Sequence, residues 1–251
     1  MATNTSLKVL VSGSSGFIGK CLCQFLLKKG FRVVHLVREK RSNFSSVLWD
    51  PEAEKANLED FEGFDAVIHL AGENLATGIW TSSKKKRILE SRKKGTEFLV
   101  SLLKQLKSPP KVFLGASAIG YYGSSSSVKT EESPSGNGFL AEVCRVWESA
   151  SDPLESLGIR TVHSRLGVVI SSQGGMLKKL LPIFRWGLGG KIGDGKQKIS
   201  WVSLEDVLGA FYHILMEESL RGAVNIVSPF PVSQEYFAKA LSKVLFKPCF
   251  F

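Results

Sequence analysis

The sequence has few of the residues that mark several common protein classes. Its 251 residues include only four histidines and four cysteines, and Cys21, Cys23, Cys144 and Cys249 show neither a CxxC pair nor zinc-ligand spacing. We therefore expect reduced thiols, a cytoplasmic protein and no metal site. No segment approaches the about 20 uninterrupted apolar residues of a membrane span, and residues 1–6 form a polar lead-in unlike an export signal, so we expect no membrane partner.

A glycine-rich turn follows an apolar run near the start of the chain. Residues 7–11 predict a buried strand and residues 18–29 a helix, with glycines spaced GxxGxxG at their junction. Gly13 permits a tight turn, Gly16 lets the backbone approach a pyrophosphate, and Gly19 lets the helix pack closely on the strand. Free amides at the helix start would then face the phosphates. The alternative is a glycine-rich turn without a ligand. The predicted cofactor contacts here are Gly13, Ser14, Ser15, Gly16, Phe17, Ile18 and Gly19.

The second predicted strand, residues 31–37, lacks the terminal acid that is typical of NAD-binding proteins. That Asp or Glu accepts hydrogen bonds from ribose hydroxyls, but here the strand ends at Val37 and Arg38 follows. A guanidinium favours a 2′-phosphate, and Lys40 and Arg41 add positive potential. The sequence therefore predicts NADP(H) in preference to NAD(H); the alternative is that Arg38 is a solvated surface charge.

The formal net charge of +10 raises the question of nucleic-acid binding. The densest basic run, residues 84–87 with 92–94, falls on a predicted helix over residues 81–107 that has its own apolar side. We interpret the run as a solvated helix face. Because no signature of a nucleic-acid-binding fold accompanies the charge, we expect no nucleic-acid partner and instead attraction of an anionic cofactor or substrate.

Strands and helices alternate along the rest of the chain. Further apolar strands are predicted at residues 66–72, 111–117 and 161–170, and a helix at 140–157. This order predicts an α/β fold with a Rossmann-type doubly wound parallel sheet, whose ligands lie beyond the carboxyl ends of the strands. The non-periodic residues 124–138 predict a loop over that edge that is able to act as a lid.

The chain length favours one α/β domain with a smaller appended part. We expect an NADP-binding Rossmann domain over residues 1–170, to which a core strand near 223–228 returns. Residues 171–251 would form mainly a small C-terminal substrate region. Within it, residues 174–198 combine a predicted helix with a glycine-rich loop, whose three lysines either approach an anionic substrate or are simply solvated.

Several ordered segments resemble an extended short-chain dehydrogenase/reductase: GSSGFIG, HLAGE, GASAIGYYG, GLGGKIGDGKQ and WVSLEDV. The most similar branch is that of the NAD-dependent epimerase family proteins, some of which carry the label SulA-like cell-division inhibitor. This resemblance implies NADP(H) binding, with Leu70, Ala71 and Gly72 along the adenosine half and Ser117 near the nicotinamide. It also implies an oxidoreductase or a nucleotide-sugar-epimerase-like enzyme acting on a small metabolite.

The catalytic residues of that superfamily are only partly present. Typical members use a Ser and a YxxxK pair, whose Lys helps to lower the pKa of the Tyr. Ser117 is present, but Leu140 and Cys144 stand where the pair is expected. Ser117 with Tyr121 or Tyr122 are thus the candidates to polarise a substrate carbonyl. The alternatives are that Ser117 bonds its own loop and that both tyrosines pack against the cofactor.

Other features carry structural expectations or leave alternatives open. His69 and His163 lie in apolar strands and are predicted to be core histidines with satisfied hydrogen bonds, and Cys144 to be a small core residue. The chain stops at Phe250 and Phe251, where family members continue, which suggests either a truncated sequence or a reduced substrate region. A catalytically silent NADP(H)-binding sensor or scaffold is the alternative to an enzyme. The sequence leaves the substrate and the oligomeric state open.

Overall fold

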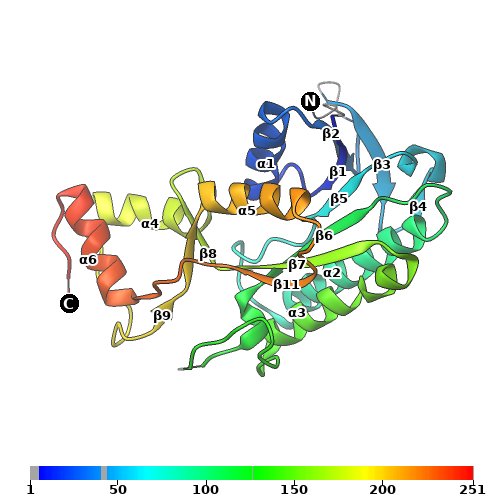
Figure 1. The fold of residues 1–251 in the computed structure, drawn as a ribbon. Coiled ribbons are helices and arrows are strands. Elements are labelled where there is room, and N and C mark those ends of the chain that lie inside the picture. The colour runs from blue at the N-terminus through cyan, green and yellow to red at the C-terminus, as the bar shows by residue number, and fades with distance from the viewer. Residues whose placement is uncertain (1–5, 41–43, 126, 251) are drawn as a thin grey trace. The chain divides into compact units, whose positions relative to one another are not determined.

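The computed structural model describes residues 6–40, 44–125 and 127–250 (Figure 1). Arg41 and Phe251, which enter the expectations above, lie outside these residues.

An eight-stranded sheet is the main element of the fold. Its order is β11-β7-β6-β5-β1-β2-β3-β4. The pairs β1–β2, β1–β5, β2–β3 and β5–β6 are parallel, whereas β3–β4 is antiparallel. The chain moves outward from β1 to β3 and then returns to the other side of β1, which confirms the predicted Rossmann-type α/β fold. The strands are β1 (Lys8–Ser12), β2 (Arg32–Val37), β3 (Ser46–Asp50), β4 (Lys55–Ala56), β5 (Ala66–His69), β6 (Val112–Ala118), β7 (Arg160–Leu166) and β11 (Gly222–Ile226).

Helices cover both faces of this sheet. Helix α1 (Phe17–Lys28) and the end of α5 (Leu204–Met216) lie on one face, where the ring of Tyr212 contacts Phe25 and Phe31 edge-on (Figure 1). Helices α2 (Ser82–Leu103) and α3 (Phe139–Ser149) cover the other face. Within the described residues, short 3₁₀ helices connect elements at Leu58–Phe61, Ile119–Tyr122 and Asp152–Leu157. Strands buried on both faces explain why the sequence shows continuous apolar runs rather than alternation.

The chain forms two compact units. The first comprises residues 1–165 and 210–225, and the second comprises residues 166–209 and 226–251, so that α5 and β11 contribute to both. The second unit contains a parallel pair, β8 with β10, and an antiparallel pair, β9 with β12. Helices α4 and α6 also lie in this unit. The bounds are β8 (Val168–Ser171), α4 (Gly175–Arg185), β9 (Lys198–Ile199), β10 (Trp201–Ser203), β12 (Val232–Ser233) and α6 (Gln234–Leu245).

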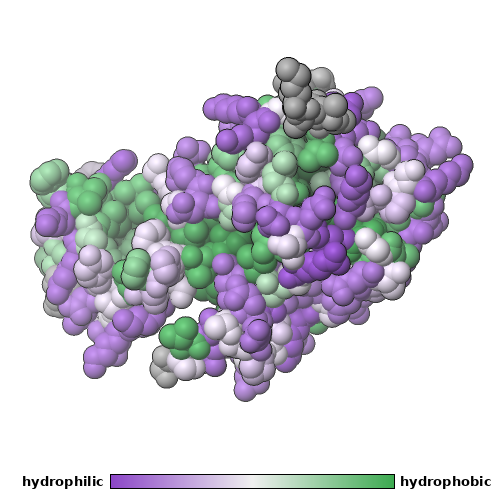
Figure 2. Space-filling view, viewed as in Figure 1, coloured by the Kyte–Doolittle hydropathy of each residue, from purple (hydrophilic) through white to green (hydrophobic). Residues whose placement is uncertain are grey.

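Several large apolar side chains of this second unit are exposed. Figure 2 shows green surface around α4 and α6, and the exposed apolar residues of these segments include Trp186, Leu188, Phe246 and Phe250. None of the helices within the described residues combines the length and apolar character that crossing a bilayer requires.

Two predicted elements are broken in the structure. The strand expected at residues 161–170 is two strands, β7 and β8, separated at Gly167. A Cβ at Gly167 would lie 2.7 Å from the Ser200 carbonyl oxygen, so the neighbouring backbone passes where a side chain would stand. The helix expected at 140–157 ends at Ser149, and a 3₁₀ helix follows. Pro153 near its start has no amide hydrogen to continue an α-helix.

The prediction that the basic run on α2 is wholly solvated is wrong for two of its members. Lys84 is 6% exposed and its ammonium contacts Glu73 at 2.5 Å. Arg92 is 7% exposed, donates to the carbonyl oxygens of Glu73 and Ile88, and lies over the Trp147 ring. Helical periodicity alone placed both side chains on the polar face, whereas the loop after β5 folds back over the helix and covers them.

Candidate functional site

The turn after β1 is built from backbone that leaves no room for side chains. Gly13 has φ +65°, a conformation that favours glycine. A Cβ there would also lie 2.7 Å from the carbonyl carbon of Leu70 and 2.8 Å from the amide nitrogen of Ala71. The turn is therefore pressed against the segment that leaves β5, and both conformation and space require glycine.

The start of α1 is packed against the same turn. A Cβ at Gly19 would overlap the carbonyl oxygen of Gly13, so only glycine lets the helix come this close. Gly16 is the residue that precedes the helix, and its own amide donates to the Gly13 oxygen at 2.9 Å. Because glycine offers no capping side chain, the amides of the first helical turn point outward without a side-chain acceptor from the N-cap. This arrangement is able to receive an anion.

A buried serine joins the ends of β1 and β5 behind the turn. Ser12 is fully buried, and its Oγ accepts hydrogen bonds from the amides of Leu70 at 3.1 Å and Ala71 at 3.2 Å. Since both of these groups donate, the Ser12 proton is free to go to Nδ1 of His69, 2.7 Å away. The strand end that was predicted to follow the adenosine half of a cofactor is thus fixed by one hydroxyl.

His69 continues this hydrogen-bonded chain as a neutral imidazole. Thr96 donates its hydroxyl to the Arg92 carbonyl oxygen, so it accepts from Nε2 of His69 at 3.1 Å. Burial, and secondarily the charge of Arg92, lowers the pKa of His69 to about 4. His163 also has a partner, the Ser151 hydroxyl at 2.9 Å. Both predictions of core histidines are confirmed.

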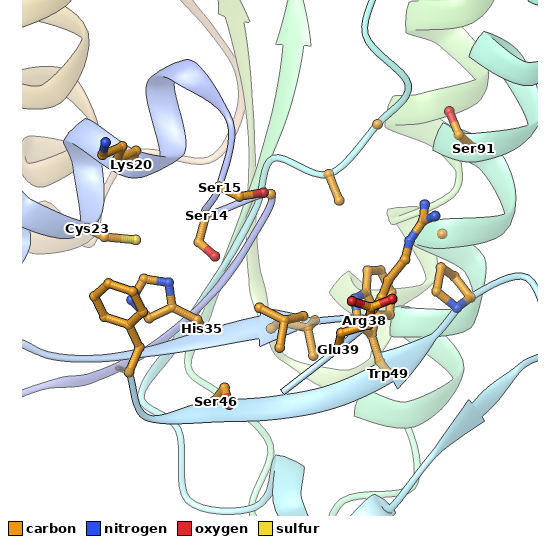
Figure 3. A pocket seen from close by; sticks show the side chains of 18 of the residues that line it. Ser14, Ser15, Lys20, Cys23, His35, Arg38, Glu39, Ser46, Trp49 and Ser91 are labelled. Carbon is orange, nitrogen blue, oxygen red and sulfur yellow. The ribbon is translucent and has the colours of Figure 1, made fainter. Parts of the chain in front are cut away.

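A pocket of about 720 Å³ opens at the carboxyl ends of β1, β2 and β5 (Figure 3). It lies entirely within the first unit. Its lining includes Gly13, Ser14, Ser15, Arg38, Ala71 and Gly72 among the sequence-predicted cofactor residues. The lining does not include Gly16, Phe17, Ile18, Gly19, Leu70 and Ser117. Gly16 precedes α1, the next three residues begin it, and the backbone of Leu70 faces the Gly13 turn.

Arg38 lies in the pocket wall immediately after β2. Its Nη1 lies 3.6 Å from Oε1 of Glu52, but both side chains are largely exposed, so this ion pair holds the guanidinium only weakly. Glu39 lines the same pocket. Lys40 is exposed nearby. The guanidinium is therefore available to a ligand, although not isolated from carboxylates.

Part of the pocket lining comes from a strand that the sequence did not predict. Strand β3 pairs with β2, and it supplies Ser46 and the buried Trp49 to the lining. Phe44, before β3, stacks obliquely on His35 with ring centroids 4.7 Å apart. The available signal was the short apolar run from Val47 to Trp49, but three apolar residues are too few to predict a strand. Other residues outside the prediction are Lys20, Cys23, Gln24, Leu27, Leu36, Val37, Glu39, Pro51, Ser91 and Gly95.

Ser117 lies at the end of β6, where its hydroxyl belongs to a buried charged network. Its Oγ donates to Oε1 of Glu148 on α3 at 2.5 Å, and Ser117 is only 3% exposed. Arg165 holds both oxygens of the same carboxylate, with Nε at 2.9 Å and Nη2 at 2.8 Å. Burial lowers the pKa of Arg165, but its hydrogen bonds to Glu148 and Tyr122 and the Glu148 charge outweigh burial, so the pKa is raised. The Ser117 proton is thereby directed away from any ligand.

The two tyrosines are held by the same guanidinium. Arg165 lies 3.5 Å from the centroid of the Tyr121 ring, and its Nη1 donates to the Tyr122 hydroxyl at 2.9 Å. Tyr122 in turn donates to Asn225 at 2.7 Å. Tyr122 is buried, whereas Tyr121 is partly exposed. Of the three candidate hydroxyls, those of Ser117 and Tyr122 already donate to protein groups.

The residues at the expected YxxxK positions are apolar or inert. Leu140 packs against Gly120, and Cys144 is buried, with its Sγ 3.6 Å from the Ala118 carbonyl oxygen. Burial raises the pKa of the Cys144 thiol, which agrees with a core residue rather than a nucleophile. Among the described residues, no group of three or more His, Cys, Asp or Glu side chains is placed to hold a metal ion.

A doubly wound sheet, a glycine turn between β1 and α1, and a pocket at the strand ends together define the class of Rossmann-type dinucleotide-binding folds. The chain belongs to the NAD dependent epimerase/dehydratase family, whose family model matches residues 9–226. The resemblance to extended short-chain dehydrogenases/reductases is therefore confirmed.

Relatives agree with this assignment. Epimerase family protein Mb2239 of Mycobacterium bovis is 36% identical over 241 residues, which are 96% of this chain and 79% of the relative. The chloroplastic SDR39U1 homolog of Arabidopsis thaliana is 34% identical, with 97% of this chain and 72% of the relative covered. The names of these relatives refer to the epimerase family and not to cell division.

Two solved structures share the fold at substantial identity. Human epimerase family protein SDR39U1 (isoform 2), solved with NADPH, has a TM-score of 0.88 and 31% identity over 98% of this chain and 82% of its own. A nucleoside-diphosphate sugar epimerase from Corynebacterium glutamicum has a TM-score of 0.84 and 35% identity. This chain is covered to 98%, and it spans about half, 53%, of the Corynebacterium chain.

Proposed function

We propose that the pocket binds NADP(H) and that the protein is an oxidoreductase or an epimerase-like enzyme of a small metabolite. The observation that carries the cofactor assignment is Arg38, which lies in the pocket wall directly after β2, where Val37 stands in place of an acid. A guanidinium matches a 2′-phosphate, whereas NAD-specific sites use a carboxylate on the ribose hydroxyls. The human relative solved with NADPH supports this choice.

The residues around the turn fit such a cofactor. Gly13 and Gly19 keep side chains out of the space beside the helix start, and the outward amides of α1 suit a pyrophosphate. Bound NADP(H) supplies a hydride donor or acceptor at its nicotinamide ring. The proposed groups near the reacting carbon are Ser117, at the end of β6, and Tyr121, in the 3₁₀ helix that follows it. Residues 171–251 are proposed to supply most of the substrate region, where Lys191, Lys196 and Lys198 suit an anionic substrate.

The test is a titration of the purified protein with NADPH and NADH, followed by the fluorescence of the reduced nicotinamide. We expect tight NADPH binding and weaker NADH binding, and Arg38→Asp should lower the NADPH affinity about tenfold or more while leaving NADH little changed. Arg32→Asp is the matched control, because Arg32 is exposed at the opposite end of the same strand. An NADPH to NADH affinity ratio unchanged by Arg38→Asp would refute the assignment.

A silent cofactor-binding sensor is the second candidate, and the Ser117–Glu148 hydrogen bond favours it. A hydroxyl that already donates to a carboxylate cannot also donate to a substrate carbonyl. A screen of carbonyl substrates by NADPH consumption distinguishes the enzyme from the silent sensor. Turnover that Tyr121→Phe reduces supports the enzyme; NADPH binding without consumption of any substrate supports the sensor.

A further inference from the structure

One wall of the pocket is a single face of α1. Lys20, Cys23, Gln24 and Leu27 line the pocket at spacings of i, i+3, i+4 and i+7, so they share one side of the helix. Figure 3 shows Lys20 and Cys23 on α1 across from His35, with Ser14 between this side and Arg38. The pocket therefore continues past the glycine turn into a lobe between α1 and β2.

The lobe is bounded mainly by groups without charge. Burial raises the pKa of the Cys23 thiol to about 12, so it is neutral at physiological pH. Burial also lowers the pKa of His35, whose ring is covered on one side by Phe44, so the imidazole is predominantly neutral at pH 7 and above. Lys20 is the exception. It lies in the first turn of α1, which contains no acidic residue, and its side chain is exposed.

Two cations thus border the pocket from opposite sides. Arg38 lines the pocket at the end of β2 and Lys20 lines it at the start of α1, and Ser14 lies between the two residues (Figure 3). The helix start adds partial positive charge on the same side as Lys20. Glu39 lines the pocket near Arg38, and Glu52 pairs with Arg38. The α1 side has no such carboxylate among the lining residues, so its positive potential is the less compensated of the two.

We infer that Lys20 is a second specificity-determining residue, which contacts the 2′-phosphate of NADP(H) from the α1 side while Arg38 contacts it from the β2 side. This inference rests on the proposed NADP(H) function. A phosphate monoester carries a charge of about −1.5 to −2 at pH 7 and three acceptor oxygens, so it accommodates a guanidinium, an ammonium and a hydroxyl together. Lys20 acts as a point charge here, whereas Arg38 supplies a planar fork of donors.

The direction of the α1 face separates this role from pyrophosphate binding. The pyrophosphate is expected at the outward amides of Phe17 to Gly19, whereas Lys20 shares its helix face with Cys23 and Leu27, which line the pocket together with residues of β2. A charge on this face should therefore distinguish NADPH from NADH. A charge that served the pyrophosphate would affect both cofactors alike.

The experiment measures the NADPH and NADH dissociation constants of Lys20→Met by nicotinamide fluorescence. We expect an NADPH dissociation constant raised about tenfold and an NADH dissociation constant changed less than about twofold. Lys20→Arg, which keeps the charge, should retain most of the NADPH affinity. Lys28→Met is the matched control, because Lys28 is exposed on the last turn of α1 and does not line the pocket. Melting of each cofactor-free variant verifies that it is folded.

Two results would overturn the inference. Equal weakening of NADPH and NADH would assign Lys20 to the pyrophosphate, and unchanged affinities would assign it to solvent. Arg38→Asp distinguishes failure of the Lys20 role from failure of the NADP(H) assignment. If Arg38→Asp changes the affinity ratio and Lys20→Met does not, only the role of Lys20 fails; if Arg38→Asp also leaves the ratio unchanged, the NADP(H) assignment itself fails.

Discussion

The polar groups at the end of β1 differ from those at the ends of β6 and β7 in what they leave open to a ligand. At the end of β1, backbone amides and glycines leave polar groups open to a ligand, and the buried support behind them is a neutral chain from Ser12 to His69 and Thr96. At the ends of β6 and β7, side chains satisfy one another through a buried ion pair, Glu148 with Arg165. The first arrangement is open to an incoming anion. The second is largely complete without a ligand, which is why cofactor binding is easier to assign here than catalysis.

The largest expected effect comes from breaking the charged network. Glu148→Ala leaves the Arg165 guanidinium buried without its carboxylate, and we expect a loss of about 3–5 kcal/mol in the free energy of unfolding, measured in urea. Glu142→Ala is the control, since Glu142 is exposed in the first turn of the same helix and should cost less than about 1 kcal/mol. Equal losses in the two variants would show that the network does not hold this strand end.

We expect the protein to lose stability in acid because of His69, which supports the glycine turn as a neutral imidazole. The pKa of His69 is about 4 in the folded protein against 6.5 unfolded, so the unfolded chain takes up this proton first as the pH falls. The contribution of His69 to the free energy of unfolding is fully present above pH 6.5. It falls by about 3 kcal/mol as the pH drops from 6.5 toward 4. Below pH 4 it changes no further.

The measurement is a series of urea unfolding curves between pH 4 and 7. His69→Phe should be less stable at pH 7 but should lose this part of the pH dependence. His213→Gln, at an exposed position on α5, should keep the slope of the unchanged protein. A slope in His69→Phe as steep as in the unchanged protein would show that other groups cause it.

A glycine pair tests whether the open turn depends on close approach or only on backbone conformation. Gly13 and Gly30 both have positive φ, but a Cβ at Gly30 meets nothing within 4 Å, whereas one at Gly13 meets the Leu70 backbone. Gly30→Ala should cost about 1 kcal/mol of strain, and Gly13→Ala about 2 kcal/mol or more together with loss of NADPH binding. Equal costs with NADPH binding retained in both variants would contradict this explanation.

The smallest effect is expected at Ser117. Its removal leaves Oε1 of Glu148 still bonded to Arg165, so Ser117→Ala should cost only about 1 kcal/mol in thermal or urea unfolding. Ser149→Ala, at an exposed position on α3, should be nearly neutral. A cost at Ser117 as large as that of Glu148→Ala would mean that the hydroxyl, and not the ion pair, organises this strand end.

The cofactor side of the site was accessible to sequence reasoning because it depends on local geometry. Gly13 and Gly19 are required by a turn and a helix within seven residues of each other, so their spacing is visible in the sequence. Trp49 and His35 reach the same pocket only because β3 pairs with β2. No local pattern in the sequence predicts that β3 pairs with β2.

The other strand end shows the opposite case. Ser117, Glu148 and Arg165 come from three separate elements, and the sequence offered no reason to connect them. The family resemblance predicted that the Ser117 hydroxyl polarises a substrate carbonyl. The structure gives its proton to Glu148, a partner 31 residues away.

The sequence by itself determined the alternation of the main strands and helices, the glycine turn and the missing acid after β2, because burial on both faces and short-range backbone geometry leave patterns along the chain. Only the tertiary structure decided which polar side chains remain open to a ligand and which are already satisfied. The sequence predicted solvated charges at Lys84 and Arg92 and a hydroxyl open to a ligand at Ser117, yet each of these side chains is buried against a partner. Hydrogen bonds and ion pairs form between groups that the fold brings within about 3 Å of each other. The local sequence does not predict which groups from distant parts of the chain come that close.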